Sequence, residues 1–206
     1  MEQGILITSL GHSCFIIEAD GVRLVLDPYQ DGSVDGLPPI REEAEAVLCS
    51  HGHHDHNNRD AVTLTGKDPW QVFRLEELSC PHDGENGTKR GMNTIHVLEA
   101  RGLRVAHMGD IGTVLSVEEC AKLGKLDAVL VPVGGFFTID AEEAHLLMER
   151  LAPRVIIPMH YKTSAEGFAP ISTVEPFLAH CANVKHYPDH RLLLTTETEA
   201  QTAVLR

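Results

Sequence analysis

Short runs of apolar residues recur along the chain, and Gly, Asp and Pro separate one run from the next. The runs are rich in Val, Ile and Leu, which favour extended strands. The pattern predicts strands at residues 5–10, 14–18, 22–26, 46–49, 95–99, 103–107, 128–133 and 155–159. The last two runs are apolar throughout, as expected of strands that are covered on both faces. A closing hairpin is expected over residues 191–205.

Helical patterns are fewer. Ser116 and Glu119 have the spacing of a capping box, and Gly124 follows as a C-cap, which predicts a helix between them. A second helix is expected over 140–151, because it opens with another capping box and continues with leucines near helical spacing. A third helix is expected to begin at Ser172 or Thr173 and to run through Leu178, which places Pro176 in its first turn, where the missing N–H costs little.

One segment of the chain resembles another. Residues 14–25 align with residues 95–106, and the pairs Glu18/Glu99, Ala19/Ala100, Gly21/Gly102 and Arg23/Arg104 are identical. Each copy is typical of a β-hairpin, with Asp20-Gly21 or Arg101-Gly102 at its turn. Either any two hairpins look this similar, or the fold has two related halves that each contribute a sheet. No linker divides the chain, so residues 1–206 are predicted to form one domain.

The strongest chemical signal follows the predicted strand 46–49. There the pattern HxHxDH is formed by His51, His53, Asp55 and His56. Residues i and i+2 of an extended chain point to the same side, so the first two histidines can bind one ion. The adjacent Asp55 and His56 need a turn to face a neighbouring ion. Imidazole and carboxylate together suit zinc, iron or manganese; the alternative is a solubilising polar loop. Alternation points His54 away, toward the periphery of the site or the surface.

With three later positions, this motif resembles the metallo-β-lactamase superfamily. They are His82, Asp110 in a Gly-Asp pair, and His160 after a strand. The resemblance covers nearly the whole chain and is closest to the compact branch of ascorbate-phosphate lactonase-like hydrolases. It implies an α/β fold, an αββα four-layer sandwich. It also implies that His51, His53 and His82 hold a first ion, that Asp55, His56 and His160 hold a second, and that Asp110 bridges both.

The spacing of the third ligand departs from the family's pattern. His82 follows His56 by only 26 residues, and in the family this histidine often lies much further downstream. His96 and His107 are therefore the rival candidates. His96 occupies the position of apolar Phe15 in the internal repeat, which favours packing, and His107 is expected to support the ligands from behind. We predict that His82 is the ligand.

Further residues are candidates for supporting roles. Asp27 and His12 could orient ligating imidazoles by hydrogen bonding, or could be turn residues. Three basic residues, Lys89, Arg90 and Lys162, lie near predicted ligands in the sequence, so they either bind an anionic group of the substrate or are ordinary solvated side chains. The segment that contains Phe136 and Phe137 follows a buried strand and is expected to form an apolar pocket wall.

Composition narrows the function further. A formal charge of −13 repels phosphate backbones and anionic lipid, so neither nucleic acid nor a membrane surface is expected as a partner. Five cysteines without a CxxC pair do not form a disulfide pattern. With neither a signal peptide nor a membrane-length apolar run, the protein is expected in the cytoplasm. The sequence predicts no particular oligomeric state.

The predicted reaction is hydrolysis. The reaction would use two divalent ions, most simply zinc, with manganese or iron as alternatives. A water that bridges the two ions would have a lowered pKa, and the ions would also polarise the electrophile. Asp55 and Asp110 would orient the resulting hydroxide and accept a proton. The expected substrate is a small, anionic ester, lactone or phosphodiester. Two other classes stay open, namely a non-haem iron oxidoreductase with the same ligands and a non-catalytic metal-dependent binding domain.

Overall fold

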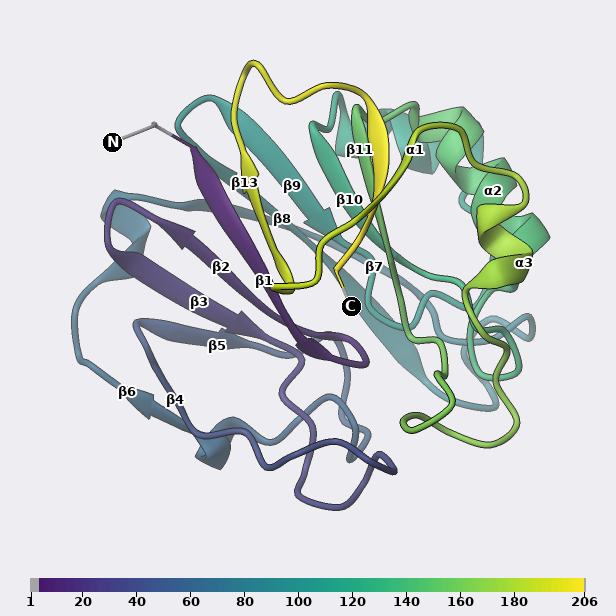
Figure 1. Ribbon diagram of the computed structural model, residues 1–206, viewed down its shortest axis with the longest axis horizontal. Coiled ribbons are helices and arrows are strands. Elements are labelled where there is room, and N and C mark those ends of the chain that lie inside the picture. The colour runs from purple at the N-terminus through teal and green to yellow at the C-terminus, as the bar shows by residue number, and fades with distance from the viewer. Residues whose placement is uncertain (1–3, 206) are drawn as a thin grey trace.

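A computed structural model describes residues 4–205, in which two β-sheets lie face to face (Figure 1). The first sheet has the order β13-β1-β2-β3-β5, formed by β13 (Arg191–Leu194), β1 (Ile5–Gly11), β2 (Cys14–Ala19), β3 (Val22–Leu26) and β5 (Ala46–Leu48). The second has the order β12-β14-β11-β10-β9-β8-β7, formed by β12 (Val184–His186), β14 (Gln201–Val204), β11 (Val155–Met159), β10 (Ala128–Pro132), β9 (Leu103–His107), β8 (Met92–Ala100) and β7 (Arg74–Pro81).

The main core lies between the two sheets. Ile7, Ile17 and Leu24 of the first sheet and Leu130 and Ile157 of the second belong to one buried cluster, and none of them is exposed to solvent. These side chains come from alternate positions of their strands, because successive side chains of a strand point to opposite faces. The apolar runs of the sequence therefore form the middle of the sandwich.

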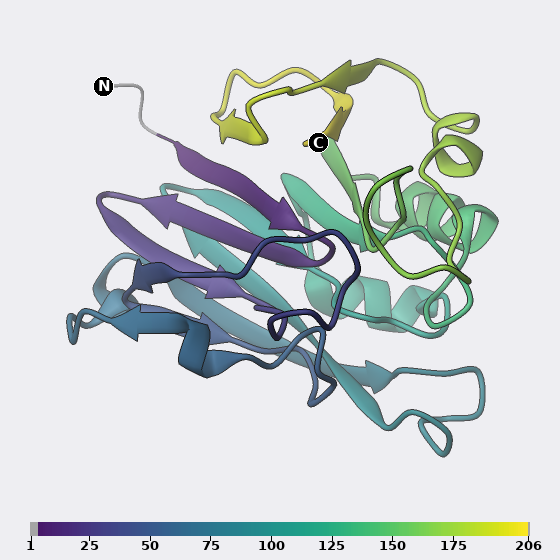
Figure 2. The same cartoon turned by 60° about the horizontal axis from the view of Figure 1, so that its bottom comes forward.

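Helices cover the outer face of the second sheet, which Figure 2 shows from another side. They are α1 (Val117–Leu123), α2 (Ala141–Leu151) and α3 (Glu175–Leu178). Both predicted capping boxes are present, at Ser116 and at Asp140. The third helix is only one turn long, and Pro176 lies at its start as predicted.

The outer face of the first sheet is covered by a loop segment and short elements, whereas α-helices cover that of the second sheet. This cover is formed by the segment around Tyr29 and Val34, and by a ribbon of β4 (Glu42–Ala44) and β6 (Val62–Leu64). Two single turns of 3-10 helix, η1 (Arg59–Ala61) and η2 (Pro69–Gln71), flank β6. The α/β sandwich expected from the sequence is confirmed, and this outer layer is built from a ribbon and 3-10 turns.

The internal repeat corresponds to two hairpins, β2–β3 and β8–β9, one in each sheet. Their registers match, because Glu18 pairs with Arg23 in one and Glu99 with Arg104 in the other. Both turns have two residues with positive φ, at 53° and 72° for Asp20-Gly21 and at 55° and 72° for Arg101-Gly102. The two turns also meet, since Nε of Arg101 donates to Asp20 Oδ1 at 2.9 Å. This arrangement supports two related halves.

The predicted closing hairpin is wrong. β13 pairs with β1 in the first sheet, whereas β14 pairs with β11 and β12 in the second, so the two strands lie in opposite sheets. Leu194 and Ala203 nevertheless belong to the same core between the sheets. The alternation of apolar and polar residues is therefore the same whether the strands pair or separate, and it could not distinguish the two arrangements.

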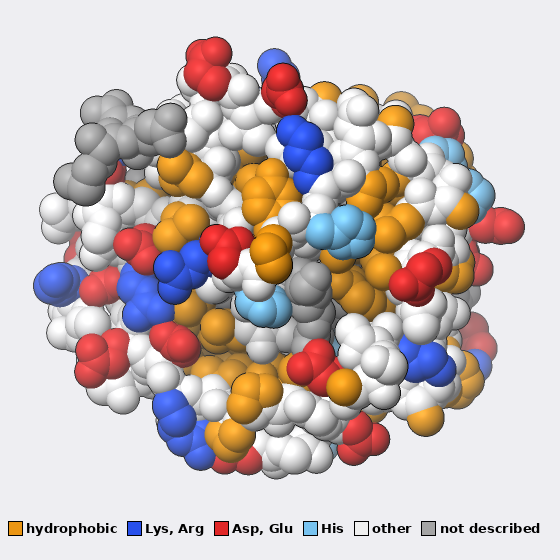
Figure 3. Space-filling model, in the orientation of Figure 1, with side chains coloured by type: hydrophobic (Ala, Val, Ile, Leu, Met, Phe, Trp, Pro, Cys, Tyr) orange, Lys and Arg blue, Asp and Glu red, His pale blue; other side chains and the backbone are white. Residues whose placement is uncertain are grey.

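Among residues 4–205, no helix has both the length and the apolar character needed to cross a bilayer. On the face seen in Figure 3, lysine and arginine side chains are interspersed with aspartates and glutamates.

Candidate metal centre

The ligand-type residues follow the ends of strands that run in the same direction within each sheet. His12 and His51 follow β1 and β5 of the first sheet, while His82, Asp110 and His160 follow β7, β9 and β11 of the second. Since these strands end at one edge of the sandwich, their loops gather side chains that are far apart in the sequence. That edge is turned forward in Figure 2.

Three histidines form a first set at this edge. The ligating nitrogens of His51, His53 and His82 lie within 4.8 Å of one another. The ring centroids are separated by 4.6 Å for His51–His53, 4.5 Å for His51–His82 and 5.0 Å for His53–His82. His53 is exposed at the mouth of the site, and its Nδ1 lies 3.3 Å from Nε2 of His82. The structure thus brings together the three residues expected to hold the first ion.

A second set is formed by Asp55, His56 and His160, and His12 joins it. Asp55 Oδ2 lies 3.2 Å from Nε2 of His12, 3.2 Å from Nε2 of His56 and 3.9 Å from Nε2 of His160. We expected His12 to orient a ligand or to form a turn. It does form the turn after β1, with φ of 54°, and it also offers a nitrogen to the second set itself.

Asp110 lies between the two sets. Its carboxylate oxygens are 3.2 Å from Nε2 of His56 and 3.3 Å from Nε2 of His160, on the side of the second set. The same carboxylate is 3.5 Å from Nε2 of His82 and 3.9 Å from Nε2 of His51, on the side of the first. A carboxylate that faces histidines of both sets is placed to bridge two cations.

The unpaired polar atoms of the centre fit metal ions. Nε2 of His51, His56 and His160 and Oδ1 of Asp110 are buried without a hydrogen-bond partner. Buried polar atoms are nearly always paired, because an unpaired one costs about 1–3 kcal/mol. Here these atoms converge on one another, and the donors are imidazole nitrogens and carboxylate oxygens with no thiolate. Such a set suits zinc, iron or manganese.

Nearby charges and burial set the protonation states of the residues in the centre. Burial opposes the protonation of His56, but Asp110 and Asp27 outweigh it and raise the pKa of His56 well above its ordinary value. Burial likewise opposes ionisation of Asp110, yet His160 and His56 hold the pKa of this carboxyl well below its usual range. Burial, followed by repulsion from His56, lowers the pKa of His51 to about 3, which keeps it neutral. The ionised Asp110 and the neutral His51 are therefore in the forms that bind metals, whereas His56 has to release its proton when an ion binds.

Asp27 supports ligands of both sets from behind. It is fully buried, and its carboxylate accepts hydrogen bonds from the backbone N–H and the hydroxyl of Ser50, both at 2.6 Å. The same carboxylate lies 2.8 Å from Nδ1 of His56, and the Ser50 hydroxyl lies 2.9 Å from Nδ1 of His51. Each contact engages one ring nitrogen and turns Nε2 toward the centre.

The rival histidines lie outside both sets. Nε2 of His107 donates to the carbonyl of Ser13 at 2.9 Å, and its Nδ1 accepts from the backbone N–H of Gly109 at 3.1 Å. His107 therefore contacts the turn that carries Asp110. His96 is buried beside it, and its Nε2 lies 3.2 Å from Glu77. Neither residue belongs to a candidate metal group among residues 4–205.

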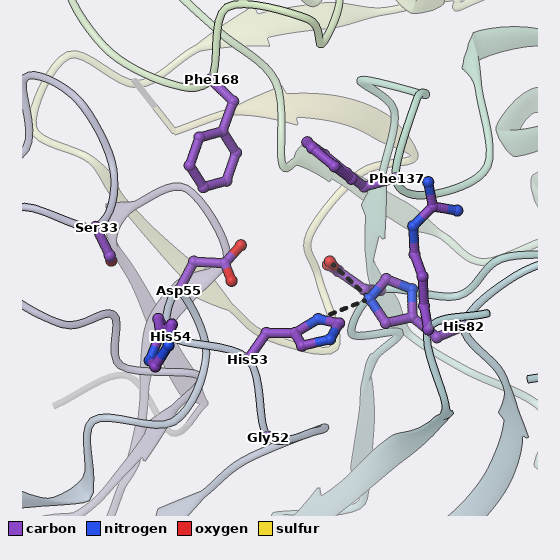
Figure 4. A pocket seen from close by; sticks show the side chains of 10 residues that line it. Ser33, Gly52, His53, His54, Asp55, His82, Phe137 and Phe168 are labelled. Carbon is purple, nitrogen blue, oxygen red and sulfur yellow. Dashed lines mark hydrogen bonds and ion pairs between the residues drawn. The ribbon is translucent and has the colours of Figure 1, made fainter.

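A cavity of about 580 Å³ opens over the centre. Figure 4 shows Asp55, His53 and His82 pointing into it, with Phe137 and Phe168 on the side opposite Gly52 and His53. Its lining consists of Ser33, Gly52, His53, His54, Asp55, His82, Arg90, Asp110, Phe137 and Phe168.

Of the three basic residues singled out from the sequence, only Arg90 lines this cavity. Nζ of Lys89 lies 2.8 Å from a carboxylate oxygen of Glu85, and Nζ of Lys162 donates to the carbonyl of Ala169 at 2.6 Å. Both lysines are placed outside the lining. A position close to a ligand in the sequence therefore did not predict the direction of these side chains.

Three lining residues were not expected from the sequence, and one of them, Ser33, lies in the segment between β3 and β4. His54 lines the cavity because residues 51–56 form turns, so the strand alternation that would point it away does not apply. Phe168 lies in a long loop after His160 without any motif, and its ring meets that of His12 at 5.2 Å, nearly edge-on. Phe137 lines the cavity as predicted, whereas Phe136 stays 65% exposed next to it.

Comparisons with known proteins show which sequences and structures this chain resembles. A model of the β-lactamase superfamily domain matches residues 6–160. A UPF0173 protein of Pyrococcus abyssi is 31% identical over 186 residues, which cover 77% of this chain and 86% of that protein. A UPF0173 metal-dependent hydrolase of Korarchaeum cryptofilum is 29% identical over 185 residues, which cover 76% of this chain and 83% of that protein.

A solved structure shows the same similarity. A protein of Thermotoga maritima, described as a candidate zinc-dependent hydrolase of the metallo-β-lactamase superfamily, superimposes with a TM-score of 0.74 at 29% identity. The superposition covers 97% of each chain. Because the family model matches well over half of the sequence, this chain belongs to the metallo-β-lactamase superfamily.

Proposed function

We propose that the protein is a metal-dependent hydrolase that uses two divalent cations to cleave a small anionic ester, lactone or phosphodiester. Zinc is the metal that we propose for both sites. The observation that carries this proposal is the position of Asp110, whose carboxylate lies 3.2–3.9 Å from nitrogens of His51, His56, His82 and His160. The relatives named metal-dependent hydrolases support the reaction class.

The residues of the centre would then divide into three roles. His51, His53 and His82 would hold one ion; Asp55, His56 and His160 would hold the other; and Asp110 would bridge them. When bound, two such ions supply a nucleophilic water whose pKa falls toward about 7, and they polarise the bond under attack. Asp55 and Asp110 both line the cavity, so they are placed to orient that water and to accept its proton.

Size and charge favour a small, anionic substrate. The cavity of about 580 Å³ has the size of typical small-molecule sites. Two divalent ions carry more positive charge than Asp55 and Asp110 carry negative charge, so the loaded centre attracts anions. Arg90 adds a further positive charge at the cavity wall.

The experiment combines metal analysis with a substrate panel. The protein reconstituted with zinc or manganese is expected to bind close to two ions per chain and to hydrolyse at least one ester, lactone or phosphodiester. His82→Ala should lose about one ion and most of the activity, because it removes a nitrogen from the first set. His96→Ala is the matched control, since it removes a buried histidine of the same sheet that belongs to neither set.

Four results would contradict the proposal or part of it. A stoichiometry of zero after reconstitution would remove the metal centre, and a value near one would remove the second site. Greater metal loss from His96→Ala than from His82→Ala would show that the third ligand is misplaced. Iron in protein purified without added metal, together with oxygen consumption, would favour the oxidoreductase class instead.

A further inference from the structure

We propose that the cavity selects an amphiphilic anion, with Arg90 binding the charged group and Phe137 and Phe168 binding an apolar group of the same molecule. This inference rests on the proposed function only in placing the scissile bond at the metal centre. The chemical class is a carboxylate, phosphate or phosphonate that carries an aromatic or branched aliphatic group.

Arg90 is held in place before any ligand arrives. Its Cζ lies 5.5 Å from the ring centroid of Phe137, which is within the range of a cation–π contact. Its Nη2 also donates to the carbonyl of Phe136 at 3.2 Å, which uses one of the five N–H donors of a guanidinium. A positioned guanidinium gives up less conformational freedom on binding an anion than a mobile lysine would.

The loop that carries Arg90 is organised by the buried carboxylate of Asp83. Its two oxygens accept hydrogen bonds from the backbone N–H groups of Glu85, Gly87, Lys89 and Arg90, at 2.8, 2.9, 3.0 and 2.7 Å. Only 2% of Asp83 is exposed, so these bonds are shielded from water. Because Asp83 directly follows His82, the loop fixes Arg90 relative to the first set of ligands.

The apolar part of the cavity is formed by Phe137 and Phe168, which lie in two loops other than the one that carries Arg90. The rings of Phe137 and Phe168 are 5.8 Å apart at 72°, and both side chains remain partly exposed in the cavity. Figure 4 shows them facing the cavity across from His53. Aromatic rings left in contact with water gain free energy when an apolar group covers them.

These features together favour an amphiphilic anion over two simpler kinds of ligand. A small inorganic anion would satisfy Arg90 but would leave both phenylalanine rings in water. A neutral apolar molecule would cover the rings but would leave Arg90 without an anionic partner. Arg90 is the only lysine or arginine that lines the cavity among the described residues, so the charged group of the ligand has one defined position on this wall.

The test measures binding by titration calorimetry to the metal-loaded protein, with three probes. Phenylphosphonate carries both features, methylphosphonate keeps the charge alone, and benzyl alcohol keeps the ring alone. The wild type should bind phenylphosphonate about tenfold more tightly than methylphosphonate, and benzyl alcohol more weakly than either.

Variants separate the two parts of the site. Arg90→Ala should weaken both phosphonates by about tenfold to a hundredfold. Phe137→Ala should weaken phenylphosphonate by about three- to tenfold more than methylphosphonate, because only phenylphosphonate also loses its ring contact, and so reduce the preference between the two phosphonates. Lys89→Ala is the matched control, because it removes the same charge from the same loop, where the ammonium faces Glu85 and not the cavity. Metal content is measured for every variant.

Equal effects of Arg90→Ala and Lys89→Ala would overturn the proposal, as would equal losses of both phosphonates in Phe137→Ala. The titration needs bound metal but no turnover. If these binding patterns hold while no ester, lactone or phosphodiester is hydrolysed, the hydrolytic function fails and this inference stands. If hydrolysis is found without the patterns, this inference alone fails.

Discussion

A single buried carboxylate, Asp27, connects the two sets of metal-binding residues. It lies 2.8 Å from Nδ1 of His56 directly, and it reaches His51 through the hydroxyl of Ser50. Burial alone would raise the pKa of Asp27, but the facing His56 and His107 hold it at about 2, so the group is ionised at neutral pH. An ionised acceptor behind a ligating ring, directly at His56 or through the Ser50 hydroxyl at His51, makes Nε2 a better electron donor to a metal.

Asp27→Asn tests this connection. The amide keeps the size of the side chain but replaces one acceptor oxygen with N–H donors, so the variant should bind both ions about ten- to a hundredfold more weakly. Ser50→Ala breaks only the link to His51 and should weaken the first ion alone. Affinities are measured by competition with a chromophoric chelator. If Asp27→Asn bound both ions as tightly as the wild type, the proposed support would be wrong.

Sequence reasoning was most effective where ligands are close along the chain. The spacing of His51, His53, Asp55 and His56 is local, so chemistry and geometry can both be inferred from it. His12 and Asp55 are 43 residues apart in the sequence, and they meet because β1 and β5, which precede them, belong to the same sheet. No local pattern encodes such a contact, and the nitrogen that His12 offers to the second set was therefore not foreseen.

At the scale of elements, strands of the core were predicted more accurately than strands of the edge. β2, β3, β9 and β11 lie in the buried middle and appear within one residue of their expected bounds. β7 was missed because it is an edge strand with Arg74, Glu76 and Glu77 in its first half, a composition that does not indicate a strand. Yet β7 leads directly to His82, so a missed edge element carries one of the ligands.

The ends of β7 and β9 are tied together at Gly112. The backbone N–H of Gly112 donates to the carbonyl of Pro81 at 3.0 Å. A Cβ at Gly112 would lie 2.2 Å from the nitrogen of Asp83 and 2.3 Å from the carbonyl carbon of His82. Both are backbone atoms that cannot turn aside, so a side chain here must displace the segment that carries His82.

Gly112→Ala is therefore expected to lower occupancy of the first metal site by about half or more while the second site stays filled, because a 1 Å displacement of a ligand suffices to spoil a site. Metal analysis after dialysis against a weak chelator provides the measurement. Gly84→Ala is the control in the same region, because a Cβ there would meet no atom within 4 Å. Full occupancy in both variants would mean that the backbone accommodates the added methyl group without moving His82.

At the scale of the whole molecule, the metal centre joins the two halves. His51, His53, Asp55 and His56 follow the first sheet, whereas His82, Asp110 and His160 follow the second. The halves share the core between the sheets, but at this edge buried polar side chains face one another with unpaired atoms. Bound ions would attract side chains from both sides of the junction and offset the repulsion between Asp55 and Asp110, so metal binding and stability are linked.

This linkage predicts the effect of metal removal. A ligand present at a hundred times its dissociation constant stabilises the native state by about 2.7 kcal/mol. Two such ions together contribute about 5.4 kcal/mol. For a chain of this size each kcal/mol corresponds to about 2–4 °C, so removing both ions should lower the Tm by about 10–20 °C. Differential scanning calorimetry of the zinc-loaded protein with and without EDTA measures the shift, and readdition of zinc should restore it. His82→Ala supplies the control, since a protein that already lacks the first site should lose less. An equal EDTA shift in His82→Ala and wild type would place the stabilising ions elsewhere, and no shift in either would show that the ions do not join the halves.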